Sequence, residues 1–223
     1  TTHRRSAILL GPGASGSPAT LAPFLDGLRR LGFAAEPLAL PRGAAPAAAR
    51  RLRASLPADR LVVLGGHSFG GRVASLVAAS DGPQIGGLVC LSYPLHRPGR
   101  PEAGLRTEHW PAIRCPTLLL SGERDPFARL DLLRAAVAEL PDAELVTYAG
   151  LGHDLRAVAD DVCRRIAAFV EGRVGAAARP ALRRPPKRVH RARPDGDPLG
   201  GRIFGLTPDF GAALGVPSRL HSA

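Results

Sequence analysis

The sequence has few cysteines, and they are not spaced as metal ligands. Its three cysteines, Cys90, Cys115 and Cys163, are odd in number and scattered, with no Cys-x-x-Cys pair. Small extracellular domains use dense, even sets of cysteines, and zinc sites use closely spaced pairs. We therefore expect reduced thiols in a cytoplasmic protein, and the sequence predicts no metal site, no disulfide framework and no other cofactor.

Long apolar segments are also missing. No apolar run reaches the roughly 18 residues needed to cross a bilayer. The basic start of the chain is followed by only a short apolar run at residues 7–10, which Gly11 and Pro12 interrupt, so it is too short for the core of a secretory signal. We expect a protein with no membrane contact.

Positive charge is concentrated at the end of the chain. The formal net charge is +11, and residues 173–223 hold 10 of the 30 basic residues but only 3 of the 19 acidic ones. The run 176–193 mixes arginine with proline and contains no aromatic residue, so it favours neither a packed core nor base stacking. We expect a domain over residues 1–172 and a basic tail over 173–223 that is disordered or loosely docked. The tail could bind nucleic acid or an acidic partner, but a solvated tail with no dedicated partner is the simpler interpretation.

Apolar and amphipathic segments alternate along the first three quarters of the chain. The hydrophobic period predicts strands at 6–10, 33–38, 61–65, 85–91, 117–121 and 144–148. It predicts helices at 18–31, 44–55, 71–80, 128–140 and 155–170. About six strands that alternate with helices are typical of an α/β fold with a doubly wound, mostly parallel sheet. The loop 92–110 has no room for a large helical lid, so we expect an open cleft.

A serine flanked by glycines follows the third predicted strand. Residues 65–71 read Gly-Gly-His-Ser-Phe-Gly-Gly, which contains Gly-x-Ser-x-Gly at Gly66, Ser68 and Gly70. Small residues are required there because the turn from strand to helix is tight in a nucleophile elbow. The motif recurs by chance in a chain with 26 glycines, so its weight comes from the strand before it and the helix after it.

An acid and a base are predicted at the ends of two later strands. Asp125 follows the strand at 117–121, and His153 follows the strand at 144–148. The carboxyl ends of parallel strands meet at one edge of a sheet, so both side chains should gather near Ser68. We predict Ser68 as nucleophile, His153 as its base and Asp125 as the orienting acid. The simpler alternatives are a turn serine, a capping carboxylate and a solvated loop histidine.

Other residues compete for these roles. Glu123 is the best substitute for the acid, because it lies two positions before Asp125. His67 adjoins the nucleophile, and we expect it to pack or hydrogen-bond near the elbow. His96 and His109 lie in the loop 92–110, where they line the cleft or, more simply, lie at the surface.

Backbone donors must stabilise the charge that develops on the substrate oxygen. We predict the N–H groups of Phe69, which follows the nucleophile, and of Ala14, in the glycine-rich loop 11–16. The alternative for that loop is a simple turn. Three residues near the long loop are candidates for the wall of the substrate pocket, or for plain packing: Tyr93, Leu95 and Trp110.

At these motifs the chain resembles the α/β-hydrolase superfamily, over roughly residues 6–170. The nearer likeness is to small, lid-poor dienelactone-hydrolase-like proteins, which is carried by Gly-His-Ser-Phe-Gly-Gly-Arg at 66–72 and Gly-Glu-Arg-Asp-Pro-Phe at 122–127. The chain is similar as well to a hydrolase-like subunit of a eukaryotic histone acetyltransferase (NSL) complex. The resemblance implies the same catalytic triad. Pro12 departs from the His-Gly that such proteins often have in the first loop.

Two classes of function follow. The first is a cofactor-independent serine hydrolase, carboxylesterase-like, which cleaves small esters, thioesters or lactones through an acyl-enzyme on Ser68. The alternative is a catalytically inactive hydrolase-fold protein that recruits partners, which the likeness to a chromatin-complex subunit suggests. Reaction with a fluorophosphonate separates them, because only an activated serine reacts.

Overall fold

The chain folds around a six-stranded sheet in which all strands are parallel. The computed structural model describes residues 7–14, 18–56, 61–81 and 85–174; most of the predicted tail lies outside them. The strands are β1 (Ala7–Gly11), β2 (Ala35–Pro37), β3 (Val62–His67), β4 (Ile85–Leu91), β5 (Thr117–Gly122) and β6 (Ala143–Tyr148). Their order is β2-β1-β3-β4-β5-β6. The predicted fold class is confirmed.

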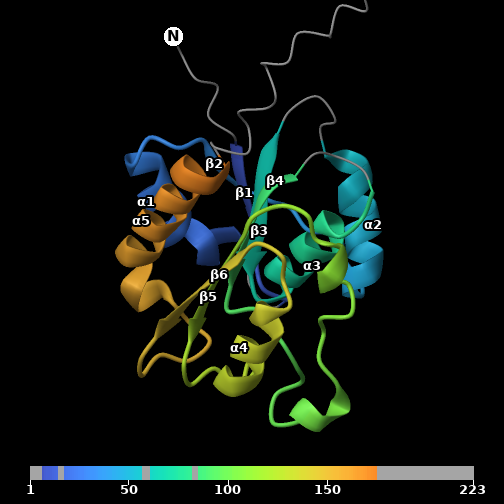
Figure 1. Ribbon diagram of the computed structural model, residues 1–223. Helices are drawn as coiled ribbons and strands as arrows, with labels where there is room; N and C mark the ends of the chain where they lie inside the picture. Colours follow the sequence, from blue (N-terminus) through green and yellow to red (C-terminus); the bar gives the residue numbers. More distant parts are fainter. Residues whose placement is uncertain (1–6, 15–17, 57–60, 82–84, 175–223) are drawn as a thin grey trace, which may run out of the picture. The chain divides into compact units, whose positions relative to one another are not determined.

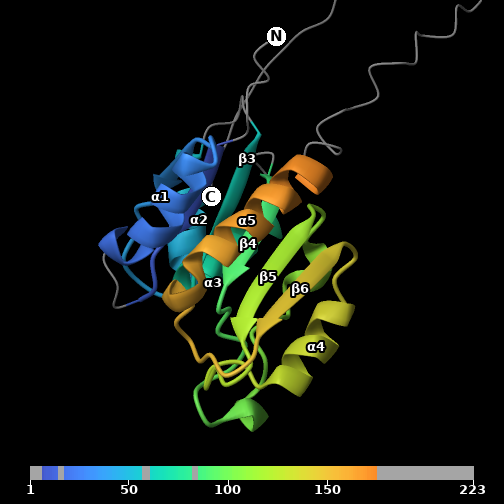
Figure 2. The same cartoon turned by 90° about the vertical axis from the view of Figure 1, so that its left-hand side faces the viewer.

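Within the described ranges, five α-helices cover both faces of this sheet (Figures 1 and 2). They are α1 (Ala22–Arg30), α2 (Ala45–Ser55), α3 (Phe69–Ala78), α4 (Leu130–Ala138) and α5 (Ala159–Phe169). Helices α1 and α5 pack on one face, and α2, α3 and α4 on the other, so the apolar core forms two layers. Among the described residues, none of the helices has the length and apolar character to cross a membrane.

The apolar period of each helix explains which side it buries. In α5, Val162, Cys163 and Ile166 recur three and four residues apart, so they lie on one face, and all are buried.

Helix α1 starts at Ala22, later than predicted, and a 3-10 turn at Pro18–Leu21 precedes it. Pro23 then lies in the first helical turn, where its missing N–H costs nothing.

Helix α5 does not end at the predicted domain boundary. A π-helical turn over Val170–Val174 continues it. Val174 is buried and lies against Gly87 of β4, and Arg173 forms an ion pair with Asp142. The first two residues of the predicted tail therefore belong to the packed domain.

The order of the strands places a crevice next to β1. The chain runs from β1 outward to β2 and then returns to β3 on the other side of β1. Connections that diverge in this way leave an opening at the carboxyl ends of the strands, where open α/β sheets bind ligands. Gly11 at the end of β1 pairs with Gly66 of β3, so the first loop lies beside the nucleophile elbow.

The predicted pocket residues of the long loop lie in the core instead. Tyr93, Leu95 and Trp110 are 1%, 0% and 2% exposed and belong to the layer beneath α2, α3 and α4. The rings of Tyr93 and Trp110 meet edge to face at 5.1 Å between centroids. The Tyr93 hydroxyl donates to the carbonyl of Arg106 at 2.6 Å, which fastens the two arms of the loop together.

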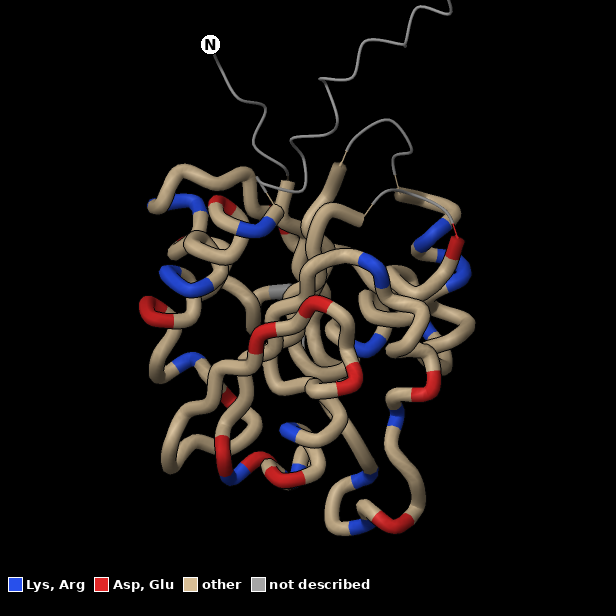
Figure 3. Tube along the Cα trace, in the orientation of Figure 1, with Lys and Arg blue, Asp and Glu red and all other residues tan. Residues whose placement is uncertain are grey.

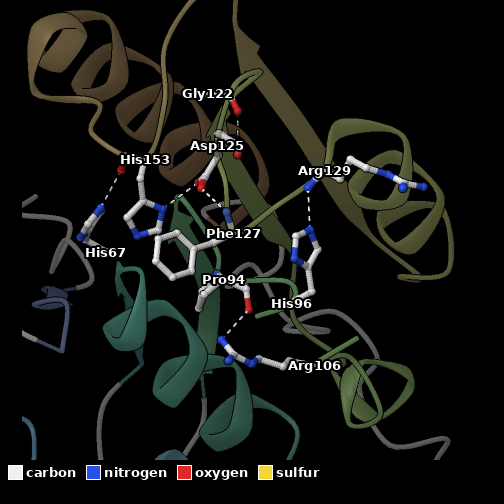
Figure 4. Close-up of polar contacts among 10 residues, drawn as sticks. His67, Pro94, His96, Arg106, Gly122, Asp125, Phe127, Arg129 and His153 are labelled. Atoms are coloured by element: carbon white, nitrogen blue, oxygen red, sulfur yellow. Dashed lines mark hydrogen bonds and ion pairs between the residues drawn. The ribbon is translucent and has the colours of Figure 1, made fainter. Parts of the chain in front are cut away.

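His96 of this loop is internal as well, so the expectation of a surface role is wrong for it, whereas His109 is half-buried. His96 is 3% exposed; its Nε2 accepts the N–H of Arg129 at 2.9 Å, and its Nδ1 donates to the carbonyl of Arg97 at 2.8 Å (Figure 4). His109 Nε2 lies 2.8 Å from the hydroxyl of Ser75 on α3. Both side chains hold the loop against the domain, because a buried imidazole needs partners for its nitrogens.

Candidate active site

One carboxylate of the described residues is buried, whereas the other charged side chains are not. Acidic and basic residues of the described chain are mixed along the trace (Figure 3), and most of their ion pairs are exposed. Asp125 is the exception: it is 4% exposed, and no other aspartate, glutamate, lysine or arginine in the described ranges is buried. A buried carboxylate is costly unless hydrogen bonds stabilise it, so its partners indicate its role.

Both oxygens of Asp125 accept hydrogen bonds. Oδ1 accepts the N–H of Phe127 at 2.8 Å, and Oδ2 lies 2.8 Å from Nδ1 of His153 (Figure 4). An ionised carboxylate can only accept, so Nδ1 of His153 carries the proton. Nε2 then holds a free lone pair and can act as a base. The structure thus joins the predicted acid to the predicted base.

The loops that carry this pair are bonded to each other. The N–H of Arg124 donates to the carbonyl of Leu151 at 2.8 Å, and the N–H of Glu123 donates to the carbonyl of Tyr148 at 3.0 Å. Gly122 permits the approach, since a Cβ there would collide with the carbonyl oxygens of the facing loop. The geometry of the acid and the base is therefore set by backbone contacts.

Glu123 does not take the role of the acid. Its Oε1 accepts the hydroxyl of Thr147 at 2.9 Å, away from the imidazole. Asp154, next to His153, instead forms an ion pair with Arg156. Glu123, the predicted substitute for Asp125, is thus hydrogen-bonded to a residue near the end of β6.

Ser68 lies at a strained turn between β3 and α3. Its φ is 51° and its ψ is −111°, a conformation that non-glycine residues rarely adopt. The turn is held because the N–H of Ser68 donates to the carbonyl of Leu91 at 2.8 Å. A Cβ at Gly66 or at Gly70 would collide with the carbonyl oxygen of Gly11. The sequence therefore meets the steric demands of a nucleophile elbow, and α3 starts directly after it, earlier than predicted.

Ser68 and His153 line the same cleft, which measures about 470 Å³. The other residues of its wall come from the first loop, the 3-10 turn before α1, α1, the end of β3 and the segments after β5 and β6: Gly13, Ala14, Thr20, Phe24, His67, Phe127, Asp154 and Arg156. The ring of Phe127 lies 4.5 Å from that of His153 and restricts its rotation. The predicted nucleophile and the predicted base therefore face one space of ligand size.

His67 supports the base from the side of the elbow. Its Nε2 lies 2.9 Å from the carbonyl oxygen of His153, to which it donates, and the two rings are 4.8 Å apart. Burial lowers the pKa of the His67 imidazole below its usual value, so the ring is neutral near pH 7. The expectation that it would hydrogen-bond near the elbow is confirmed.

Of the two predicted oxyanion donors, Ala14 lines this cleft, and Phe69 directly follows Ser68 in the chain. Phe69 is the first residue of α3, and the N–H groups of a first helical turn have no partner within the helix. Ala14 and Gly13 line the cleft beside Ser68, although residues 15 and 16 of the same loop lie outside the described ranges. Pro12 has no N–H, so the N–H groups of Gly13 and Ala14 are the candidate donors among the described residues that follow it in this loop.

Sequence reasoning missed four residues of the cleft wall: Thr20, Phe24, Phe127 and Arg156. Phe127 was part of a recognised motif, and its position two residues after the acid was the available signal. Thr20 and Phe24 come from the segment before and within α1, and nothing in the local sequence indicates that this segment reaches the elbow.

The cysteines lie outside this cleft, and all three are unpaired. Burial raises the pKa of Cys115 and of Cys163 to about 11, so both remain protonated thiols near pH 7. Neither has the acidity of a reactive cysteine.

Comparisons with known proteins agree with the α/β fold. The family model described as an alpha/beta hydrolase domain matches residues 44–164, more than half of the chain. A predicted CIB-like hydrolase from Thermoplasma acidophilum is 19% identical, with a TM-score of 0.63 over 76% of this chain and 88% of that one. Est1E from Butyrivibrio proteoclasticus is 14% identical, with a TM-score of 0.60 over 74% and 88%. A thermophilic esterase from Thermogutta terrifontis is 17% identical, with a TM-score of 0.55 over 74% and 89%. At these identities the likeness to solved structures concerns the fold.

Proposed function

Because the chain belongs to the α/β-hydrolase domain family, we propose that it is a serine hydrolase that cleaves small esters, thioesters or lactones. The observation that carries the proposal is the 2.8 Å hydrogen bond between Asp125 and His153, in a cleft that Ser68 also lines. A buried carboxylate on one imidazole nitrogen leaves the other free to accept a proton, which is what a serine nucleophile requires.

The reaction starts when Nε2 of His153 removes the proton of Ser68 and the serine oxygen attacks the substrate carbonyl carbon. The carbonyl oxygen gains the negative charge, which the N–H groups of Phe69 and Ala14 stabilise. His153 then gives its proton to the leaving oxygen or sulfur, and the acyl-enzyme forms. Water, activated by the same imidazole, releases the acid and restores the serine.

Asp125 stabilises the imidazolium that forms in each step. Its side chain is 0% exposed, whereas that of His153 is 23% exposed, so the proton exchanges at the cleft and the counter-charge stays inside. Charges interact more strongly away from water, and the N–H of Phe127 keeps the carboxylate in place. The transition state is thus stabilised by groups that are already oriented.

The test is the hydrolysis of p-nitrophenyl butyrate by Ser68→Ala. We expect kcat to fall by on the order of 10⁶ if the protein behaves as serine proteases do. Ser92→Ala is the matched control, because Ser92 also follows a strand and also has a positive φ of 49°, but it is fully buried away from the cleft. Unchanged turnover in Ser68→Ala would remove this serine from the mechanism.

Within the family, we propose the dienelactone-hydrolase-like branch, near the hydrolase-like subunit of the NSL complex. The motifs at 66–72 and 122–127 support it. Hydrolysis of a small unsaturated lactone at a rate comparable to that of an open-chain ester is the expected result. Turnover of open-chain esters alone would place the protein elsewhere in the family.

We also propose that the protein works in the cytoplasm. Its three unpaired cysteines support a reducing compartment. Alkylation of freshly lysed cells followed by mass spectrometry should find all three as free thiols. A disulfide-linked pair in that sample would contradict the proposal.

A further inference from the structure

A second cleft adjoins the one that holds Ser68. It measures about 420 Å³, and Gly13 and Ala14 line both clefts. Its far wall is the segment after β2, which includes Leu38 and Ala39. On the side of the nucleophile elbow, the wall of this second cleft is formed by Phe69. The two spaces therefore meet at the glycine-rich first loop, directly beside the predicted oxyanion donors.

The catalytic groups divide between the two clefts. His153 lines the first cleft and does not line the second. Phe69, whose N–H is a predicted oxyanion donor, lines the second cleft. A tetrahedral intermediate carries its leaving oxygen and its acyl chain on different bonds of one carbon, so they must extend in different directions. The leaving oxygen must face His153, because this imidazole supplies its proton.

Building on the proposed hydrolase function, we propose that the substrate spans both clefts across Gly13 and Ala14. The leaving group occupies the cleft of His153, and the acyl chain occupies the cleft of Leu38, Ala39 and Phe69. The substrates are then esters or thioesters with an apolar acyl group of several carbons.

The walls of the second cleft fit an apolar chain. Besides backbone, it presents carbon side chains, including Leu38, Leu40 and Phe69, and Arg42 is the one charged residue among those that line it. Arg42 is exposed, so its charge can stay in water while a chain lies beneath it. Each methylene buried there should raise kcat/KM roughly fourfold until the cleft is full.

A crossed experiment tests this assignment. Ala39→Phe narrows the second cleft and Thr20→Phe narrows the first; both positions are exposed, so both variants should fold. One substrate series keeps p-nitrophenol as leaving group and lengthens the acyl chain from acetyl to octanoyl. The other keeps an acetyl group and enlarges the alcohol from methyl to naphthyl. The ratio kcat/KM is measured for every combination after circular dichroism has verified folding.

We expect Ala39→Phe to lower kcat/KM at least tenfold for octanoyl esters and less than twofold for acetyl esters and for the alcohol series. Thr20→Phe should lower kcat/KM for the larger alcohols and, by one constant factor, for all p-nitrophenyl esters, so the dependence on acyl length stays unchanged. A loss that grows with acyl length in Thr20→Phe, or with alcohol size in Ala39→Phe, would overturn the assignment while leaving the hydrolase function intact. Failure of the wild-type protein to hydrolyse any ester would instead remove the proposed function, and this inference with it.

Discussion

Nδ1 of His153 lies 2.8 Å from Oδ2 of Asp125, and the ring of Phe127 lies against the same imidazole at 4.5 Å between centroids. The carboxylate of Asp125 fixes the tautomer of the His153 imidazole, and the phenyl ring of Phe127 fixes the plane of that imidazole. Phe127 is also tied to the acid, because its own N–H donates to Oδ1 at 2.8 Å. Two residues of one turn thereby determine the orientation of the base.

This relationship predicts the effect of Asp125→Asn. The amide would present an N–H to Nδ1, which favours the tautomer with its proton on Nε2, so the ring could no longer accept the proton of Ser68. By analogy with serine proteases, kcat should fall by on the order of 10⁴. Glu123→Gln is the control, since Glu123 binds Thr147, and it should change kcat less than threefold. Steady-state kinetics on p-nitrophenyl butyrate compare them, and equal losses would mean that Asp125 does not orient the base.

The elbow also makes a prediction about stability. Gly70→Ala would push a Cβ into the backbone carbonyl of Gly11, which cannot rotate away as a side chain can. We expect a loss of about 1–3 kcal/mol in the free energy of unfolding. Gly172→Ala meets no atom within 4 Å and should change it by less than about 1 kcal/mol. Urea denaturation of both variants decides, and a Gly70→Ala variant as stable as the wild type would refute the close approach.

A buried position in the long loop separates packing from substrate binding. Leu95 is 0% exposed in the core, so Leu95→Ala should cost about 2–5 kcal/mol of stability. Because Leu95 lines neither of the two clefts, the preference for acyl length should stay unchanged. Leu31→Ala, at a side chain 43% exposed, should cost less than about 0.5 kcal/mol. If Leu95→Ala changed the preference for acyl length without a loss of stability, Leu95 would be part of the substrate pocket and not of the core.

The half-buried imidazole of His109 predicts a loss of stability in acid. Burial lowers its pKa, an effect that the charge of Glu108 opposes and that of Arg72 adds to. The unfolded state, with a pKa of about 6.5, therefore takes up a proton first as the pH falls. Stability should decline from about pH 6.5 downward through the lower native pKa.

The measurement is urea denaturation at pH 8 and at pH 5 for the wild type and His109→Gln. The variant should lose less stability between these two pH values than the wild type does. Some dependence should remain, because burial lowers the pKa of His67 in the same direction. An identical decline in both proteins would show that His109 does not contribute.

The sequence could predict the sheet, and the edge of the sheet at which the three candidate catalytic residues lie, because these signals are local. Ser68, Asp125 and His153 each follow a strand, and parallel strands bring such positions to one edge. The loop 92–110 could not be predicted in this way. It has no apolar period, and the burial of Tyr93 depends on contacts with distant elements.

The cleft wall depends on tertiary structure to a similar degree. Thr20 and Phe24 reach the cleft because α1 packs next to the switch between β1 and β3. Leu38 is apolar and follows a short strand, so its sequence does not distinguish a cleft wall from a core position. The type of a residue indicates which chemistry its side chain can perform. Which residues surround a loop residue depends on the tertiary fold, so the local sequence could not predict the cleft wall.

The most direct test of the account is the reaction of the full-length protein with a fluorophosphonate, followed by intact-mass measurement and peptide mapping. An activated serine displaces fluoride and keeps the phosphonyl group, so we predict one adduct, located on Ser68, in the wild type and in Ser92→Ala, and none in Ser68→Ala. A folded wild-type protein that stays unmodified, or an adduct on another residue, would contradict the claim that Ser68 is the nucleophile.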